Sequence, residues 1–140
     1  MTSTASHLEH INPSELLGFD GISQVVRAQR GSMVFLSGQS AFNPRFELIG
    51  GDDFKAQAIA ALNNVAIAIQ AAGGSAGDIV SSTVYIKGLS PARSGQFFKA
   101  MSQALDGKAF PVHAISLIGI QELGSPEQLI EITSTALLDR

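Results

Sequence analysis

The sequence predicts a single α+β domain in which two helices cover one face of a mixed sheet. Three observations indicate this fold: an apolar stripe at helical spacing over 54–72, an alternating strand over 79–87, and a serine–proline pair at 90–91 that begins a second helix. With 140 residues, the chain can bury a core of its own. We assign residues 1–20 to an N-terminal arm and 21–140 to the domain.

Two strands are expected directly after the arm. The arm itself contains no periodic pattern and is interrupted by Asn12-Pro13. Residues 24–29 and 32–40 are rich in strand-forming side chains and flank Arg30-Gly31. This arrangement is typical of a hairpin, so we predict that the two strands pair with each other.

The first helix is the strongest local prediction. Asp52 or Asp53 can cap its first turn, and Gly73-Gly74 supplies the left-handed residue that commonly ends a helix. Between them, apolar residues recur at steps of three and four, which places them on one helical face: Phe54, Ala58, Leu62, Val65, Ile69 and Ala72.

A strand, a helix and two further strands complete the domain. Residues 79–87 alternate in polarity, which is typical of a strand with one buried face. The helix that begins at Ser90-Pro91 ends near Asp106-Gly107, and its apolar residues are interpreted as core: Phe97, Phe98, Met101 and Leu105. Strands over about 114–121 and 128–138 follow, so the predicted order is β-β-α-β-α-β-β.

The sheet face turned away from the helices is expected to carry few charges. It would carry Ile115 and Leu117 or their neighbours, together with the outward residues of two other strands: Ser81, Thr83, Tyr85, Glu131, Thr133 and Thr135. A surface so poor in charge is typical of a subunit interface. The pattern therefore predicts a homo-oligomer.

Composition argues against several classes of protein. Nine basic and twelve acidic residues give a formal net charge of −3, which disfavours a nucleic-acid partner. No segment has the apolar length of a membrane span, so no membrane partner is expected. The absence of cysteine excludes disulfides and thiolate metal sites, and it suits a reducing cytoplasm.

Short segments, taken in order and spacing, resemble the YjgF/RidA family of reactive-intermediate deaminases. They cover almost the whole of residues 21–138: Ile22–Val26, Phe35–Gln39, Asp53 with Gln57, Asn63–Val65, Ala71–Gly73, Asp78–Val80, Thr83–Ile86, Phe110-Pro111 and Leu129–Ile132. The resemblance implies a chorismate-mutase-like fold and a homotrimer, with small-molecule clefts between the subunits.

Glu131 is the candidate catalytic residue. A carboxylate in mid-strand between Ile130 and Ile132 must be hydrogen-bonded, paired or protonated if it is buried. From the pattern alone it could equally be a solvated residue at a sheet edge. The resemblance implies that it lies in the cleft and orients or deprotonates a water molecule near the substrate.

The residues expected around Glu131 depart from the family pattern. In the deaminating members an arginine after Phe-Pro binds the substrate's carboxylate. Here either His113 or Ile115 takes that position, depending on register, and Ile22 replaces an aromatic hydroxyl. Ser37 and Leu117 complete the expected ligand-binding set. For His113 we favour a strand-end histidine, either with a partner of its own or facing water, over a role in ligand binding.

The sequence predicts neither a metal nor a cofactor. His7, Glu9 and His10 have suitable ligand chemistry, but they lie in the arm without a scaffold, so a solvated tail is the favoured interpretation. An imine is already electrophilic at carbon, and its hydrolysis requires only water and a base. We expect either an imine or enamine hydrolase that acts poorly on simple 2-imino acids, or a non-catalytic protein that binds a small metabolite.

Overall fold

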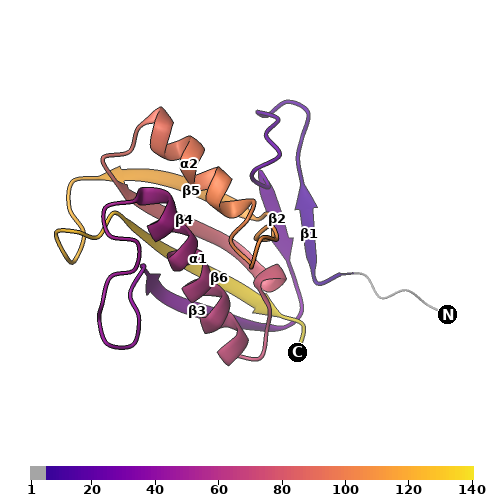
Figure 1. Ribbon diagram of the computed structural model, residues 1–140. Coiled ribbons are helices and arrows are strands. Elements are labelled where there is room, and N and C mark those ends of the chain that lie inside the picture. The colour runs from indigo at the N-terminus through magenta and orange to yellow at the C-terminus, as the bar shows by residue number, and fades with distance from the viewer. Residues whose placement is uncertain (1–5) are drawn as a thin grey trace.

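The computed structural model describes residues 6–140 and contains a four-stranded sheet, a separate two-stranded ribbon, two α-helices and one short 3₁₀ helix (Figure 1). Residues 1–5 of the predicted arm lie outside the described part. The elements are β1 (Leu8–Ile11), β2 (Val25–Ala28), β3 (Ser32–Gln39), α1 (Phe54–Ala71), η1 (Ala76–Asp78), β4 (Ile79–Lys87), α2 (Pro91–Met101), β5 (Ala114–Ile120) and β6 (Ile130–Leu138).

The main sheet has the strand order β3-β6-β4-β5. β4 and β5 run parallel, whereas β6 is antiparallel to both β3 and β4. Both α-helices lie on the same face of this mixed sheet (Figure 1). The predicted α+β class, with two helices covering one face, is therefore confirmed.

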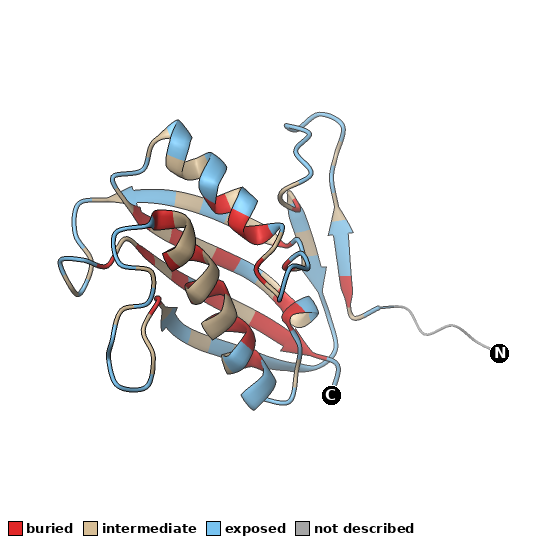
Figure 2. Ribbon diagram, viewed as in Figure 1, coloured by how far each residue is buried: buried red, intermediate tan, exposed pale blue. Residues whose placement is uncertain are grey.

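The first helix forms as its sequence predicts. Asp53 is the N-cap, and its carboxylate accepts a hydrogen bond from the Ala56 amide at 3.2 Å. Gly73 follows the helix with φ +91°, a conformation that glycine adopts without strain. The apolar stripe packs on the sheet, with Leu62, Val65 and Ile69 at most 2% exposed (Figure 2). Ala72, the last predicted member of the stripe, is exposed.

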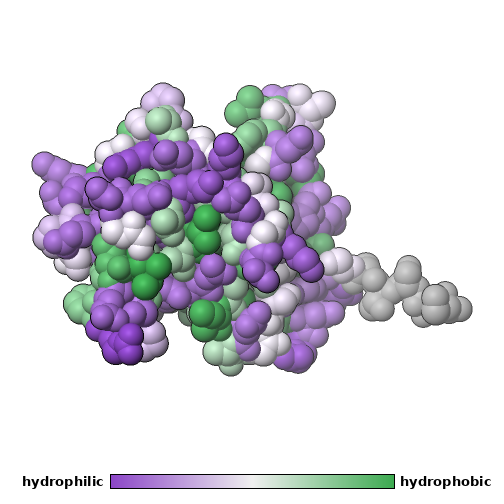
Figure 3. Space-filling model, in the orientation of Figure 1, coloured by the Kyte–Doolittle hydropathy of each residue, from purple (hydrophilic) through white to green (hydrophobic). Residues whose placement is uncertain are grey.

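The second helix also begins at its predicted cap, where the Ser90 hydroxyl accepts a hydrogen bond from the Arg93 amide at 3.2 Å. Phe97 and Met101 are buried against the rest of the core. In the space-filling view of this side, apolar residues form small separate patches among polar ones (Figure 3). Within residues 6–140, no helix has the length and apolar character needed to cross a bilayer.

The opposite, outer face of the sheet is poor in charge, as predicted, and of the two alternatives left open for β5 it carries the neighbours of Ile115 and Leu117. Ile115 and Leu117 pair with Ser82 and Val84 and pack against the helix-side core. Because side chains alternate along a strand, their neighbours Ser116 and Ile118 lie on the outer face. That face also exposes Met33 and Phe35 of β3, at 61% and 72%.

The hairpin prediction is wrong. β2 pairs with β1 along its whole length, whereas β3 pairs with β6 in the other sheet. Leu8–Ile11 was expected to be part of an irregular arm, but it is a strand. Arg30 and Gly31 both have positive φ, at 62° and 145°, and they redirect the chain between the two sheets instead of closing a hairpin.

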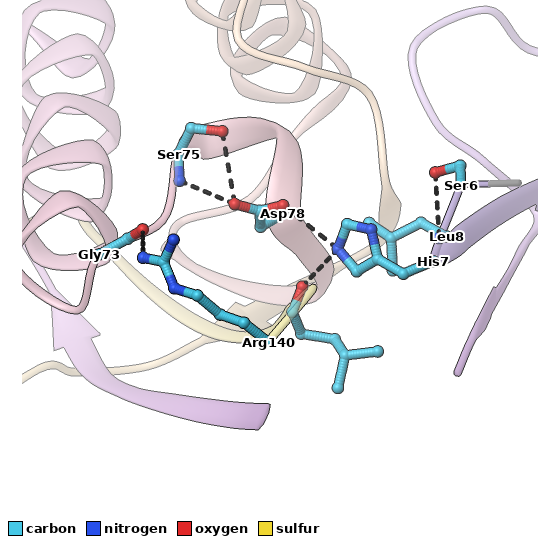
Figure 4. Close-up of polar contacts among 8 residues, drawn as sticks. Ser6, His7, Leu8, Gly73, Ser75, Asp78 and Arg140 are labelled. Atoms are coloured by element: carbon cyan, nitrogen blue, oxygen red, sulfur yellow. Dashed lines mark hydrogen bonds and ion pairs between the residues drawn. The ribbon is translucent and has the colours of Figure 1, made fainter. Parts of the chain in front are cut away.

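His7, the residue directly before β1, holds the β1–β2 ribbon against the rest of the domain (Figure 4). His7 Nε2 lies 2.7 Å from the Leu137 carbonyl and 3.3 Å from the Asp78 carboxylate. The same carboxylate accepts a hydrogen bond from the Ser75 amide at 2.9 Å, which closes η1. Asp78 therefore links the ribbon to the turn that leads into β4.

Candidate active site

Glu131 lies on the outer face of β6, against the backbone of β3. The register of β3 shifts between Leu36 and Gln39, so that Ser37 and Gly38 form an irregularity opposite β6. A Cβ atom on Gly38 would lie 2.5 Å from Glu131 Oε2. Only glycine therefore permits this approach, and the bulge positions the half-buried carboxylate.

Side-chain amides fix the rest of this site. Gln128 Nε2 donates to Glu131 Oε1 at 3.2 Å and also to the hydroxyl of Ser40. The Ser40 hydroxyl in turn donates to the Ile130 carbonyl at 2.8 Å. Gln128 and Ser40 are almost fully buried, at 3% and 7% exposure. The amide that holds Glu131 is therefore itself rigidly placed.

Helix α1 supports these groups from behind. Gln57, which is fully buried, donates to the Glu127 carbonyl at 3.0 Å and accepts from the Leu129 amide at 2.9 Å. It thus binds the backbone on both sides of Gln128. Asn64 donates to the Ser40 and Phe42 carbonyls at 2.7 and 2.9 Å. A helix predicted from its apolar stripe also carries the polar residues that position the loops around Glu131.

A cavity of about 310 Å³ opens beside the carboxylate. Glu131 is the one ionisable residue in its lining, which consists of Gly38, Gln39, Ser40, Phe42, Phe46, Asn64, Gly124, Ser125, Gln128 and Glu131. The Phe42 and Phe46 rings contact each other with centroids 4.7 Å apart. The site is therefore a small cavity with one carboxylate, several neutral amides and an aromatic wall.

His113 lies on the other side of the sheet and is 2% exposed. Its Nδ1 is 2.8 Å from the Pro111 carbonyl, which can only accept, so Nδ1 carries the proton. Nε2 then accepts from the Ser82 hydroxyl at 2.7 Å, and Ser134 lies 2.8 Å from Ser82. This is one of the two arrangements that we favoured for His113 from the sequence.

Burial is the main electrostatic influence on this histidine. Desolvation lowers the pKa of His113 to about 4, the hydrogen bond to the Pro111 carbonyl opposes that change, and the nearby His10 imidazole adds to it. His113 is consequently neutral at physiological pH and offers no positive charge to a ligand.

No basic side chain from β5 reaches the Glu131 face. The sequence left open whether His113 or Ile115 takes the family's arginine position, and both point to the helix side. The β5 residues on the outer face are Ala114, Ser116, Ile118 and Ile120, none of which is charged. The carboxylate clamp is therefore absent in both registers.

The remaining predicted ligand-binding residues do not join Glu131 within one chain. Ile22 lines a different cavity, of about 480 Å³, together with His10, Phe19, Asp20 and Val112. Ser37 directly precedes Gly38 in the bulge and is exposed. The role of Ile22, Ser37, His113, Ile115 and Leu117 in binding a ligand stays a prediction.

A family model described as "Endoribonuclease L-PSP" matches residues 17–138. The chain belongs to this family, which is the YjgF/RidA (Rid) family. A crystal structure of the conserved Rid protein YyfB from Yersinia pestis is 32% identical, with a TM-score of 0.86 over 95% of this chain and 100% of that one. Escherichia coli TdcF with bound serine is 29% identical, with a TM-score of 0.66 over 88% and 91% of the two chains.

One curated relative carries an assigned reaction. It is 2-iminobutanoate/2-iminopropanoate deaminase from Salmonella typhimurium, which is 44% identical over 59 residues. The match covers 42% of this chain and 45% of the relative, so this chain spans about half the length of the relative that it matches. The similarity supports a Rid-type deaminase or small-molecule-binding protein.

The three candidate metal ligands of this Rid protein have other partners. His10 Nδ1 is 2.7 Å from the Ser23 hydroxyl, and Glu9 forms an ion pair with Arg27 at 2.5 Å. His7 binds the Leu137 carbonyl and Asp78. Among residues 6–140, no three potential ligands are grouped to hold a metal ion.

Sequence analysis missed the aromatic wall and the amide that holds Glu131. Gln128 lies three residues before Glu131 and two residues before β6, and this spacing is the one local signal that could have indicated it. Phe42 and Phe46 lie on a loop that we did not assign to the site. Their position depends on the chain folding back over the end of β3, which no local pattern reveals.

Proposed function

We propose that this Rid protein is a trimer whose inter-subunit cleft binds a small metabolite, and that Glu131 activates water there to hydrolyse an imine or enamine. The observation that carries the proposal is the position of Glu131, an outer-face residue of β6, beside a cavity whose lining contains no other ionisable residue. Family membership supports the same chemistry. The residues present suffice for it without a metal or cofactor, and the cysteine-free composition suits a cytoplasmic protein.

The reaction uses only groups that the site and solvent supply. Water forms a C–O bond at the imine carbon and gives a proton to the Glu131 carboxylate, while the C=N π pair moves to nitrogen. With a protonated imine this gives a neutral amine. Glu131 returns its proton to the amine nitrogen, the C–N bond breaks with its electron pair on nitrogen, and ammonia leaves as an oxygen lone pair forms the C=O bond. The hydroxyl proton returns to solvent, and the carbonyl product remains. Gln128 holds Glu131 Oε1, whereas Oε2 lies beside Gly38, which also lines the cavity, and is left to accept the proton.

The lost arginine restricts the substrate. A 2-imino acid such as 2-iminopropionate carries a carboxylate, and the outer face of β5 offers only uncharged side chains, those of Ala114, Ser116, Ile118 and Ile120. Losing a charge-assisted bidentate contact costs on the order of 2–5 kcal/mol, or roughly 30- to 5,000-fold in efficiency. Simple 2-imino acids are therefore poor substrates.

The trimer proposal draws support from the exposed apolar residues of the outer face. Met33, Phe35 and Ile118 are 61%, 72% and 43% exposed in the single chain. Contact with neighbouring subunits would remove them from water and could bring Ile22 of one subunit toward Glu131 of the next. Light scattering on the purified protein tests this, and a stable monomer would contradict the inter-subunit cleft.

The decisive assay is ammonia release from imines generated in situ: 2-iminopropionate by an amino-acid oxidase, and imines without a carboxylate by an amine oxidase. We expect Glu131-dependent release from at least one imine that lacks a carboxylate, and little from 2-iminopropionate. Glu131→Gln is compared with Glu127→Gln, an exposed carboxylate on the loop directly before β6, to separate a specific effect from a change in net charge.

The alternative function is non-catalytic binding of a small metabolite. The apolar replacements at Ile22 and Ile115 fit this alternative as well as they fit a changed substrate. If Glu131→Gln alters ligand affinity and no imine is turned over, the binding function is supported and the hydrolase function is rejected.

A further inference from the structure

The aromatic wall of the Glu131 cavity includes a phenylalanine that the fold itself does not require. Phe46 has φ +63°, a left-handed conformation that is unfavourable for a bulky residue. Its side chain is nevertheless 73% exposed, so burial does not compensate for the strain. Strain of this kind is concentrated at ligand-binding sites.

The loop that carries Phe46 is held in one conformation. The Asn43 side-chain carbonyl accepts from the Arg45 and Glu47 amides at 2.9 and 3.0 Å, and its amide donates to the Glu47 carboxylate at 2.8 Å. Asn64 anchors the Phe42 carbonyl to helix α1. The two rings are thus presented beside the cavity by a rigid turn.

The electrostatic character of the cavity is uniformly negative or neutral. Its lining contains the Glu131 carboxylate and no lysine or arginine. The faces of the Phe42 and Phe46 rings carry the negative part of an aromatic quadrupole, which attracts cations. Combined with a carboxylate, such rings form the usual recognition site for an organic ammonium group.

Two basic side chains, Arg45 and Lys87, do not change the charge of the cavity lining. Arg45 is paired with Glu47 at 3.1 Å and is 82% exposed. Lys87, the last residue of β4, lies 3.3 Å from Glu122 and donates to the Pro126 carbonyl at 2.9 Å. Neither residue lines the cavity.

We infer that the Glu131 cavity takes a small organic cation, an amine or iminium with protonated nitrogen and no carboxylate of its own. The nitrogen pairs with the Glu131 carboxylate, and the Phe46 ring covers the alkyl or aryl part. This inference rests on the proposed use of the Glu131 cavity as the ligand site, and it names the class of ligand. It also agrees with the reaction, because a protonated imine is the more electrophilic form.

Three probes that share one ring and differ in charge test the inference: cyclohexylammonium, cyclohexanol and cyclohexanecarboxylate. Each is titrated into the full-length protein, and binding is followed by NMR chemical shifts of residues around Glu131. We expect the cation to bind at least tenfold more tightly than the neutral probe, and the anion most weakly. Equal affinity for the cation and the anion would overturn the inference.

Variants test whether Glu131 and Phe46 each contribute to the preference for the cationic probe. Glu131→Gln should lower the affinity for the cation at least tenfold and leave the affinity for cyclohexanol little changed. Glu127→Gln should alter neither affinity. Phe46→Leu should weaken the cation about threefold or more, and Phe46→Tyr should restore it because the aromatic face is kept. Unchanged cation binding in Glu131→Gln would place the probe elsewhere and reject the assignment.

The outcomes separate this inference from the proposed reaction. If cyclohexylammonium binds in a Glu131-dependent manner while no imine is hydrolysed, the ligand class stands and the hydrolase function falls. If 2-iminopropionate is hydrolysed in a Glu131-dependent manner and the cation does not bind, the reaction stands and the ligand class falls.

Discussion

Two polar clusters lie on opposite faces of the same sheet, and they differ in what they leave available. On the helix side, His113, Ser82 and Ser134 hydrogen-bond to one another and to the Pro111 carbonyl, and all three are at most 6% exposed. On the outer side, Glu131 receives one hydrogen bond, from Gln128, and faces a cavity.

This difference in available hydrogen-bonding groups distinguishes the structural His113 cluster from the candidate functional site at Glu131. The histidine would draw attention in a sequence because it titrates near neutrality, yet its two ring nitrogens are fully occupied by the fold. Glu131 Oε2 accepts no hydrogen bond from residues 6–140, so it can bind a ligand or take a proton. Available hydrogen-bonding capacity next to a cavity is therefore the better indicator of function in this molecule.

The largest expected effect comes from removing the buried histidine. His113→Ala leaves a cavity and deprives Ser82 of its acceptor, so the free energy of unfolding should fall by about 3 kcal/mol or more. Urea denaturation at fixed protein concentration measures the change. Glu131→Gln should leave stability within about 0.5 kcal/mol, because its side chain faces the cavity. A comparable loss in both variants would remove the distinction between the clusters.

Acid should destabilise the fold through the same histidine. The pKa of His113 is about 4 in the folded protein against 6.5 for an unperturbed histidine, so the unfolded chain binds more protons between these values. Its contribution is complete above about pH 6.5 and is lost as the pH falls toward 4, amounting to about 3 kcal/mol. His113→Gln, which does not titrate, should flatten this part of the stability–pH curve.

Gly38→Ala tests the outer cluster by moving its carboxylate. A Cβ there would meet Glu131 Oε2 at 2.5 Å, so the strand or the carboxylate must shift, at a cost of about 1–3 kcal/mol. Ligand binding and any turnover should fall together. Gly95→Ala is the matched control, because nothing lies within 4 Å of its new methyl group and α2 should gain about 0.5–1 kcal/mol.

The smallest effect is expected at the ribbon. His7→Ala removes the contacts to Leu137 and Asp78, which are partly exposed and worth at most about 1 kcal/mol. Hydrogen exchange should increase in β1 and β2 before it increases in β6. Equal protection of the ribbon in both proteins would show that His7 does not hold it.

Local signals predicted where both helices begin, although α2 ends at Met101 and not near Asp106-Gly107 as predicted. The pairing partners of the strands were not predicted correctly. Asp53, Gly73 and Ser90 act within one turn of their own helices, so the caps were visible in the sequence. β2 and β3 were found as strands, but their partners are β1 and β6, and the choice depends on contacts distant in the chain. Whether a segment forms a strand depends mainly on its own sequence, whereas the strand with which it pairs depends on contacts distant in the chain.

The candidate site divides in the same way. Glu131 was assigned to the outer face from the alternation of β6 alone, and the structure places it there. The side of β5 was assigned less well, because His113 and Ile115 face the helices. A buried histidine is tolerated there because Ser82, on the neighbouring strand, supplies a partner. That compensation comes from a residue thirty-one positions away.

The unpaired edge of β3 bears on the stability of the protein in dilute solution. Between residues 6 and 140, β3 pairs with β6 alone, and two of its outward side chains are among the most exposed apolar residues. If assembly covers them, part of the folding free energy depends on mass action, and the melting temperature rises with protein concentration. Dilution would then act as a denaturant, and newly made chains would be most prone to aggregation before they meet their partners.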